Sequence, residues 1–195
     1  VPWRACGWGF HAEADTCACG RLCLTPPPWH RLVCVRDYLR PLGRLLHKFK
    51  FSGCTALQVM FARLILLSWL QQHRSCGLRK PDIVVCSPLN KHRRWQRGFN
   101  QSALLAQPLA HWLSCDYAPE ALTRTRKTAL QHRLSIQQRK RNLRHAFATE
   151  FSFSGQHVAL VDDVVTTGST AGEISQLLTR AGAASVQVWC LCRTL

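Results

Sequence analysis

The sequence predicts an α/β fold in which a mostly parallel sheet is flanked by helices. From about residue 80 onward, apolar runs typical of strands alternate with amphipathic runs typical of helices, in the order strand, helix, strand, helix, strand, helix, strand. Such alternation favours parallel strands joined by right-handed crossovers. A second observation is the stretch VALVDDVVTTGST at residues 158 to 170, where an apolar run meets two adjacent acids and a hydroxyl-rich loop.

The first half of the chain predicts one short strand and two helices. Val33 to Val35 is a candidate strand. After Pro41, four apolar residues have the i, i+3, i+4, i+7 spacing of a short amphipathic helix: Leu42, Leu45, Leu46 and Phe49. Gly53 closes this helix, and a longer, largely buried helix is expected from about Thr55 to Gln72.

The second half opens with DIVVCSPLN, a short apolar strand that ends at Pro88 and leads into the basic loop KHRRWQRGFNQS. The next helix is indicated by Leu104, Leu105, Leu109 and Trp112, and Pro108 should kink it. Residues 121 to 126 are a candidate strand. Ser135 and Gln138 form a capping box for a basic helix that reaches about Phe147.

After the 158–170 stretch, the run STAGEISQLLTRAG predicts a helix. Its apolar face is formed by Ile174, Leu177, Leu178 and Ala181, and Gly182 ends it. The chain closes with the strand SVQVWCLCRTL.

Composition narrows the class of protein. With 195 residues, 47% of them hydrophobic, the chain predicts one main globular domain with a small appendage. Its net charge of +16 favours polyanionic partners, namely nucleic acid, phosphorylated metabolites or an anionic membrane surface. Single cysteines scattered through apolar segments are typical of a reducing compartment, so we expect a cytoplasmic protein. The most apolar run, residues 56 to 70, contains Gln58, Arg63 and Ser68, and no membrane span is expected.

The two acids and the loop after them predict a ligand site. Ligands of parallel sheets bind at the carboxyl ends of strands, where Asp162 and Asp163 would follow the strand Val158–Val161. The loop Thr166, Thr167, Gly168, Ser169 and Thr170 would cradle a phosphate with backbone N–H groups at a helix N-terminus. Carboxylates beside it suit the vicinal hydroxyls of a sugar. The alternative, in which the acids only cap a helix, does not account for the attached loop.

This stretch closely resembles the signature of type I phosphoribosyltransferases. The resemblance implies that Asp162 and Asp163 face the ribose hydroxyls of phosphoribosyl pyrophosphate and that residues 166 to 170 hold its 5-phosphate. It also implies Mg²⁺ on the pyrophosphate and ribose oxygens. The fold would then be a type I phosphoribosyltransferase-like sheet flanked by helices.

Three further stretches, SPLNKHRRWQRGFNQSALLA, RTRKTALQHRLSIQQRKRNLRHAF and VQVWCLCRTL, resemble the ComF/GntX family, and the GntX branch in particular. These are bacterial phosphoribosyltransferase-like proteins linked to DNA uptake and the use of external DNA. The resemblance covers roughly residues 26 to 195. It implies a pyrophosphate loop at Ser87, Pro88 and Leu89, with Arg94, Arg97 and Asn100 nearby, and a mobile hood within Arg124–Arg141.

Residues 1–28 differ from the phosphoribosyltransferase-like domain expected over 29–195. They are rich in cysteine and end in the stiff linker Pro26-Pro27-Pro28. Family members carry a zinc-ribbon-like module here, but Trp3 stands where a partner for Cys6 is expected, and the second group is not a clean CxxC. A zinc site could use Cys6, Cys19 and Cys23 with Cys17 or His11. The other interpretation is a vestigial cluster.

Two classes of function remain open. The first is an enzyme that displaces pyrophosphate from phosphoribosyl pyrophosphate with an unidentified acceptor. The second is a non-catalytic module of DNA uptake that binds single-stranded DNA or senses a nucleotide, alone or with proteins of the uptake machinery. For the second, Trp95 in the basic loop could stack on a base, and a basic helix face could bind phosphates through Arg139, Lys140, Arg141 and Arg144. Solvated surface is the alternative for these cations.

Overall fold

The computed structural model describes residues 27–38, 42–51, 56–89, 98–125 and 146–194. Its elements are ordered along the chain as β1 (Arg31–Asp37), α1 (Leu42–Phe51), α2 (Ala56–Cys76), β2 (Ile83–Cys86), α4 (Gln101–Leu113), β3 (Asp116–Tyr117), β4 (Thr123–Arg124), β5 (Phe147–Ala148), β6 (His157–Val165), α6 (Ser169–Arg180) and β7 (Ser185–Arg193).

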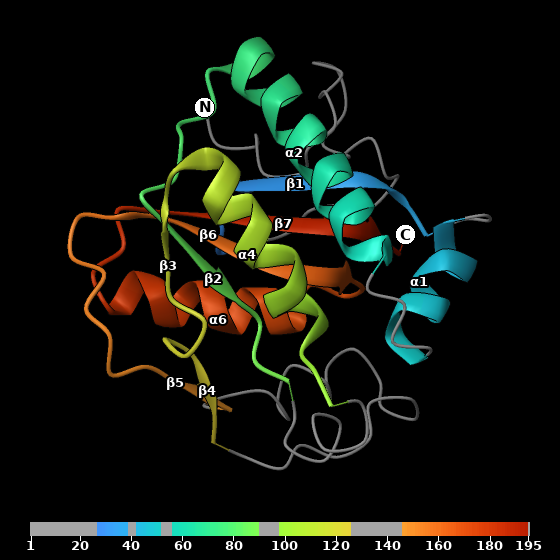
Figure 1. Ribbon diagram of the computed structural model, residues 1–195. Helices are drawn as coiled ribbons and strands as arrows, with labels where there is room; N and C mark the ends of the chain where they lie inside the picture. Colours follow the sequence, from blue (N-terminus) through green and yellow to red (C-terminus); the bar gives the residue numbers. More distant parts are fainter. Residues whose placement is uncertain (1–26, 39–41, 52–55, 90–97, 126–145, 195) are drawn as a thin grey trace.

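A five-stranded sheet forms the centre of the molecule. Its strand order is β1-β7-β6-β2-β3, and every neighbouring pair is parallel. β6 and β7 are buried over most of their length, which explains why both read as apolar runs in the sequence. The predicted α/β fold with a parallel sheet is therefore confirmed. Because every pair is parallel, the carboxyl ends of the five strands lie at one edge of the sheet, and in Figure 1 β1, β7 and β6 run toward the side of α1 and the C-terminus.

Helices cover both faces of the sheet (Figure 1). Val158 and Leu160 of β6 belong to the core beneath α6, together with Ile174 and Leu178. Ala159 and Val161 belong to the opposite core, where the buried helix residues include Phe61, Ile65, Leu105 and Leu109. The alternation of β6 between the two cores follows from the two-residue period of a strand. Each fully buried Leu or Ile stabilises the fold by roughly 1.5–3 kcal/mol.

Two short elements differ from the sequence-based expectation. The basic helix expected to reach Phe147 does not do so, because Phe147 lies in β5, and β5 pairs antiparallel with β4. Of the strand expected over residues 121 to 126, the described residues form β4 at Thr123–Arg124, which lies outside the main sheet. The fifth strand of the main sheet is β3 instead, a two-residue segment too short for a periodic signal.

The remaining helices match their predictions with shifted ends. α2 runs four residues beyond the expected Gln72, to Cys76. α4 is assigned as one helix over Gln101–Leu113 with Pro108 inside it. Leu105, Ala106, Leu109 and Ala110 are buried on the sheet side of α4, so tertiary packing maintains the helix through the proline. Among the helices that the structure describes, none combines the length and apolar character that a membrane crossing requires.

Candidate ligand site at the carboxyl edge of the sheet

The two acids lie at a step in the edge of the sheet. β2 ends at Cys86, which pairs with Val161, and the N–H of Ser87 donates to the carbonyl of Val161 at 2.9 Å. On its other side β6 continues beside β7, with Asp162 paired to Cys190 and Val165 paired to Arg193. The strand therefore does not end at Val161 as expected. Asp162 and Asp163 lie within β6, at the point where β2 no longer runs alongside it.

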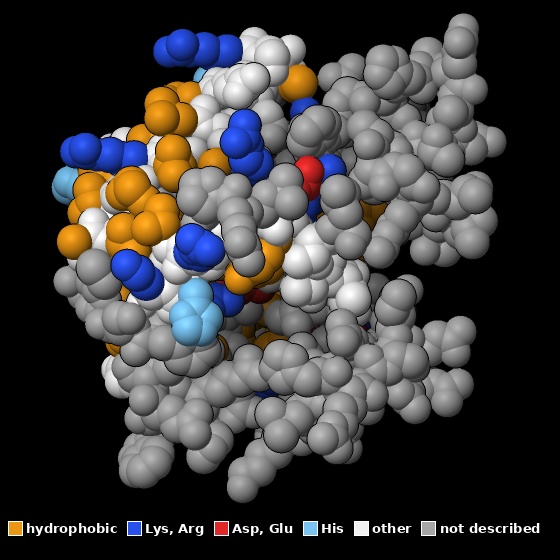
Figure 2. Space-filling view, turned by 90° about the vertical axis from the view of Figure 1, so that its right-hand side faces the viewer, with side chains coloured by type: hydrophobic (Ala, Val, Ile, Leu, Met, Phe, Trp, Pro, Cys, Tyr) orange, Lys and Arg blue, Asp and Glu red, His pale blue; other side chains and the backbone are white. Residues whose placement is uncertain are grey.

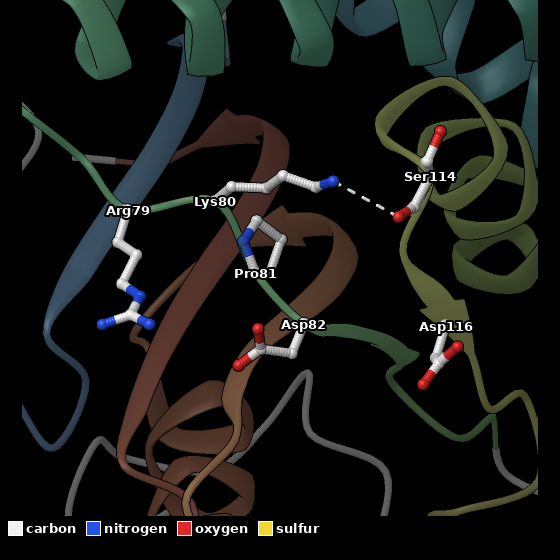
Figure 3. Close-up of a pocket in the computed structure, with 6 residues that line it drawn as sticks. All are labelled: Arg79, Lys80, Pro81, Asp82, Ser114 and Asp116. Carbon is white, nitrogen blue, oxygen red and sulfur yellow. Dashed lines mark hydrogen bonds between the residues drawn. The ribbon is translucent and has the colours of Figure 1, made fainter.

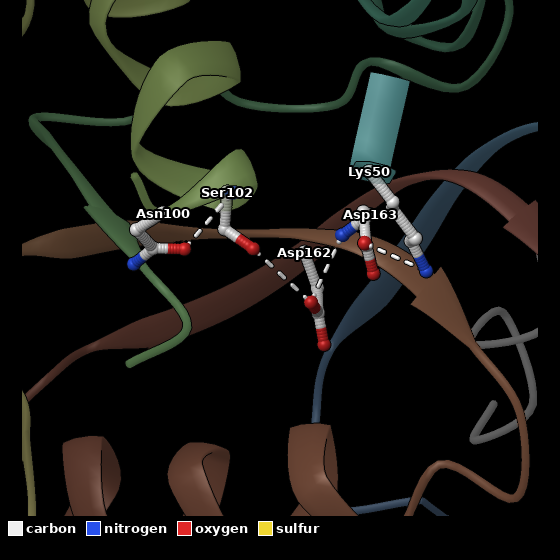
Figure 4. A network of polar contacts seen from close by, with 5 residues as sticks. All are labelled: Lys50, Asn100, Ser102, Asp162 and Asp163. Atoms are coloured by element: carbon white, nitrogen blue, oxygen red, sulfur yellow. Dashed lines mark hydrogen bonds and ion pairs between the residues drawn. The ribbon is translucent and has the colours of Figure 1, made fainter. Parts of the chain in front are cut away.

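Asp162 is held by two hydrogen bonds to one oxygen. The hydroxyl of Ser102 donates to its Oδ1 at 3.2 Å, and the N–H of Asp163 donates to the same atom at 2.9 Å (Figure 4). Burial raises the pKa of Asp162 to about 7, and the neighbouring charge of Asp163 adds to the rise. The hydrogen bond from the N–H of Asp163, then the charge of Lys50 and the hydrogen bond from Ser102, act in the opposite direction. This carboxyl therefore titrates near neutral pH.

Asp163 forms an ion pair with Lys50, from the last turn of α1. The distance between Lys50 Nζ and Asp163 Oδ2 is 2.8 Å, and both side chains are mostly buried, at 23% and 16% exposure (Figure 4). α1 reaches the site because Phe49 packs against Phe61 of α2 and Phe99 before α4, with ring centroids 5.4 and 6.5 Å apart. Sequence reasoning missed Lys50, since no local pattern links α1 to β6.

Asn100 joins the end of β2 to the start of α4. Its side-chain oxygen accepts from the N–H of Ser102 at 3.1 Å, which makes it the N-cap of α4. Its amide nitrogen donates to the carbonyl of Ser87 at 3.1 Å. Ser102, also missed from the sequence, is thereby fixed in the first turn, where its hydroxyl reaches Asp162. Pro88 and Leu89 are half-buried and directly follow Ser87.

The hydroxyl-rich loop leads directly into α6. Gly168 is the N-cap residue with φ of 70°, a left-handed conformation that favours glycine. The hydroxyls of Thr167 and Ser169 lie 2.8 Å apart, and the N–H of Ser169 donates to Thr167 Oγ1 at 3.4 Å. Thr166 is exposed and Thr170 is half-buried. The loop therefore presents hydroxyls and the positive end of a twelve-residue helix at the carboxyl edge.

The other predicted site residues lie outside the described residues. In the basic loop they are Arg94, Trp95 and Arg97, and in the expected basic helix they are Arg139, Lys140, Arg141 and Arg144. The candidate zinc ligands Cys6, Cys17, Cys19 and Cys23 also fall there. Within the part of the chain that is described, no three His, Cys, Asp or Glu side chains gather as a metal site would require.

A hollow of about 400 Å³ lies at the opposite edge of the sheet (Figure 3). It is lined by Arg79, Lys80, Pro81, Asp82, Ser114 and Asp116, from the segments that enter β2 and β3. Lys80 donates to the carbonyl of Ser114 at 3.3 Å, and Asp82 accepts from the N–H of His157 at 2.7 Å. These hydrogen bonds connect the segment before β2 to the segment before β3 and to the start of β6, at the amino ends of the strands. The hollow is therefore separate from the acid pair.

The surface around the carboxyl edge is rich in cations. Figure 2 shows this side of the molecule, where, among the described residues, Lys and Arg side chains are prominent and acidic side chains are scarce. α1 contributes Arg44, which is exposed, in addition to Lys50. Paired carboxylates, a helix N-terminus and surrounding cations can together bind an anionic sugar phosphate.

The chain matches the family model described as phosphoribosyl transferase domain over residues 100–195, which include Ser102, the acid pair and the loop. It is 54% identical over 187 residues to the DNA utilization protein YhgH of Escherichia coli K12, covering 96% of this chain and 82% of the relative. It is 38% identical over 178 residues to competence protein F of Haemophilus influenzae, covering 90% and 78%. Among solved structures, the purine phosphoribosyltransferase from Pyrococcus horikoshii is 18% identical, with a TM-score of 0.40 and coverage of 70% and 72%.

Proposed function

The chain belongs to the ComF/GntX family of phosphoribosyltransferase-like proteins, and on this basis we propose that the carboxyl edge of its sheet binds phosphoribosyl pyrophosphate or a nucleotide. The relatives are named as DNA utilization and competence proteins. We therefore place the protein in the use of external DNA, as a cytoplasmic component.

One observation carries the proposal: the acid pair and the N-terminus of α6 lie on consecutive segments at the same edge of the sheet. Carboxylate oxygens accept hydrogen bonds from a vicinal diol, and backbone N–H groups of a helix N-terminus donate to a phosphate. A ribose 5-phosphate has both groups on one molecule. The surrounding cations favour the pyrophosphate that would extend from its C1 carbon.

As an enzyme, the protein would transfer the ribose phosphate to an acceptor. A bond forms between the acceptor nucleophile and C1, the bond from C1 to the pyrophosphate oxygen breaks, and pyrophosphate leaves with the electron pair. Asp162 and Asp163 would orient the ribose, and the loop 166–170 would fix the 5-phosphate. Ser87, Pro88, Leu89, Arg94 and Arg97 would lie beside the pyrophosphate. Asn100 would act through the backbone of Ser87, to which it donates.

The proposed function involves two metal ions with different roles. Mg²⁺ would be carried on the pyrophosphate and ribose oxygens, where it neutralises charge on the leaving group. Zinc would be held by the cysteine cluster of residues 6 to 23 and would have a structural role. We expect close to one zinc per chain in protein purified without added metal. Elemental analysis that finds far less would favour the vestigial interpretation.

Binding is tested by the double variant Asp162→Asn, Asp163→Asn. Removal of both anionic acceptors should abolish Mg²⁺-dependent binding of phosphoribosyl pyrophosphate, as measured by calorimetry. Far-ultraviolet circular dichroism checks that the variant is folded. Unchanged affinity in a folded double variant would overturn the assignment of the acids to the ribose.

Catalysis is tested separately by incubating the wild-type protein with labelled phosphoribosyl pyrophosphate, Mg²⁺ and a panel of bases or short DNA. Release of pyrophosphate that depends on one acceptor identifies the reaction. Tight binding without turnover for any acceptor favours the second function, a nucleotide-sensing module.

The second function also includes binding of single-stranded DNA, favoured by the net charge of +16 and the exposed cations of this edge. Phosphate contacts must weaken with salt, with a log–log slope of about −0.7 per contact, and a base stacked on Trp95 would add roughly 1–3 kcal/mol. We expect sequence-tolerant binding that reversal of Arg139, Lys140 and Arg141 to Glu largely removes. Fluorescence anisotropy at low salt that detects no binding would leave these cations as solvated surface.

A further inference from the structure

Described side chains and backbone hold each of the two carboxylates of the site through one oxygen. Oδ1 of Asp162 accepts from Ser102 and from the N–H of Asp163, while Oδ2 of Asp163 accepts from Lys50. The hydrogen bonds and ion pairs of the described chain leave Asp162 Oδ2 and Asp163 Oδ1 without a partner. In Figure 4 the free oxygen of Asp162 points toward α6, and that of Asp163 lies on the same side.

We propose that Lys50 is a positioning residue of the ligand site. It fixes Oδ2 of Asp163 so that Oδ1 of Asp163 and Oδ2 of Asp162 face a bound ribose diol. The inference rests on the proposed function, since it names a residue of that same site. Lys50 lies outside residues 100–195, over which the phosphoribosyl transferase model matches.

The physical need for Lys50 arises from the neighbouring charges. Two adjacent carboxylates repel each other, and apolar flanks leave few groups that can stabilise their charges. Within the described part of the chain, the other groups near the pair are the hydroxyl of Ser102 from α4 and the thiols of Cys190 and Cys192 from β7. A thiol and a hydroxyl carry no positive charge. Lys50 thus supplies the cation that holds one oxygen of Asp163 and prevents its carboxylate from rotating away from Asp162.

The position of Lys50 favours this role over that of a general surface charge. Its ammonium group is 2.8 Å from Asp163 and the side chain is 23% exposed. A charge-assisted hydrogen bond at this distance is stronger than an exposed ion pair, because less water competes for it. Lys48, one half-turn earlier on α1, is exposed and therefore offers a matched cation that does not face the acids.

The test compares calorimetric affinity for Mg²⁺–phosphoribosyl pyrophosphate in the wild type, Lys50→Gln, Lys50→Arg and Lys48→Gln. We expect Lys50→Gln to weaken binding on the order of tenfold, from the loss of one charge-assisted hydrogen bond. Lys50→Arg should restore most of the affinity, because it retains the charge. Lys48→Gln, which removes the same charge from the same helix, should bind within about twofold of the wild type.

A second measurement needs no ligand. The carboxyl ¹³C resonance of Asp162, followed against pH, should show that Lys50→Gln raises its titration midpoint, because Lys50 lowers the pKa of Asp162, whereas Lys48→Gln leaves it in place. The two measurements therefore test the proposed function and the positioning role of Lys50 separately. A wild-type protein that does not bind the ligand overturns the proposed function, yet the midpoint still tests Lys50.

Equal behaviour of Lys50→Gln and Lys48→Gln in both measurements would overturn the role of Lys50, even where the wild type binds tightly. A raised midpoint together with weakened binding that Lys50→Arg restores supports it.

Discussion

The indole ring of Trp29 lies against the backbone of Gly168. A Cβ atom added to Gly168 would be 2.8 Å from Cη2 of Trp29, closer than real Cβ contacts. The side chain of Trp29 is half-buried and packs onto the core beneath α6. The residue that follows the proline linker therefore contacts the hydroxyl-rich loop, and Gly168 needs to be glycine both for its φ of 70° and for this contact.

Gly168→Ala should destabilise the protein by about 1–3 kcal/mol, because it adds left-handed strain to a steric clash with Trp29. The free energy of unfolding in urea measures the effect. Gly172→Ala is the matched control, since Gly172 has no positive φ and its added Cβ would meet Pro28 Cγ at 3.4 Å, an ordinary contact. It should change stability by less than about 1 kcal/mol, and an equal loss in both variants would contradict the special role of Gly168.

The raised pKa of Asp162 predicts a pH-dependent stability. Burial moves the pKa from 3.8 to about 7 in the folded protein, so between these values the folded state binds more protons than the unfolded state. The contribution of this group to stability therefore falls as pH rises through that window. Relative to Asp162→Asn, the wild type should be more stable at pH 5 than at pH 8, by a difference on the order of a few kcal/mol. Urea unfolding of both proteins at the two pH values measures this difference. If the stability of the wild type relative to Asp162→Asn is the same at pH 5 and pH 8, the prediction is wrong.

The ends of β1 and β7 are joined by an ion pair between Asp37 and Arg193. Nε of Arg193 donates to Oδ1 of Asp37 at 2.9 Å, and the side chains are 20% and 9% exposed for Asp37 and Arg193. Asp37→Asn should cost about 1–3 kcal/mol of stability, because the buried guanidinium loses an anionic acceptor. Chemical denaturation provides the measurement. Asp116→Asn, at an exposed carboxyl, should stay within about 0.5 kcal/mol of the wild type. Similar losses in the two variants would be inconsistent with the ion pair.

Cys34 and Cys115 are both half-buried but should react differently with alkylating reagents. A hydrogen bond from the side chain of Cys190 lowers the pKa of Cys34, assisted by the charge of Arg193, whereas burial raises the pKa of Cys115. Because the thiolate is the reactive form, iodoacetamide should modify Cys34 at lower pH than Cys115. Peptide mapping by mass spectrometry follows both sites in one sample. Faster modification of Cys115 would contradict the prediction.

Several features of the fold could be predicted from the sequence because they depend on neighbouring residues. The apolar run Val158–Val161 and the helical spacing of Ile174, Leu177 and Leu178 identify β6 and α6. The acids and the glycine at 168 are contiguous with these elements, so their place at the carboxyl edge followed from the parallel sheet.

Where a segment had weak local signals, the tertiary structure decided its conformation. Phe147 was expected at the end of a helix, but phenylalanine is enriched in strands, and its pairing with Arg124 places it in β5. The proline at 108 stays within α4 because the helix is packed on the sheet through a buried apolar face.

The surroundings of the acid pair were decided by tertiary structure alone. The sequence by itself determined that Asp162 and Asp163 end an apolar run and precede a phosphate-type loop. It did not determine that Lys50 would hold one oxygen of Asp163 and Ser102 one oxygen of Asp162. These contacts depend on which helices meet at the edge of β6. Lys50 arrives from α1 because Phe49 packs against Phe61 and Phe99. Ser102 arrives because Asn100 ties α4 to the end of β2. Contacts between segments so distant along the chain arise from packing, which no local pattern encodes.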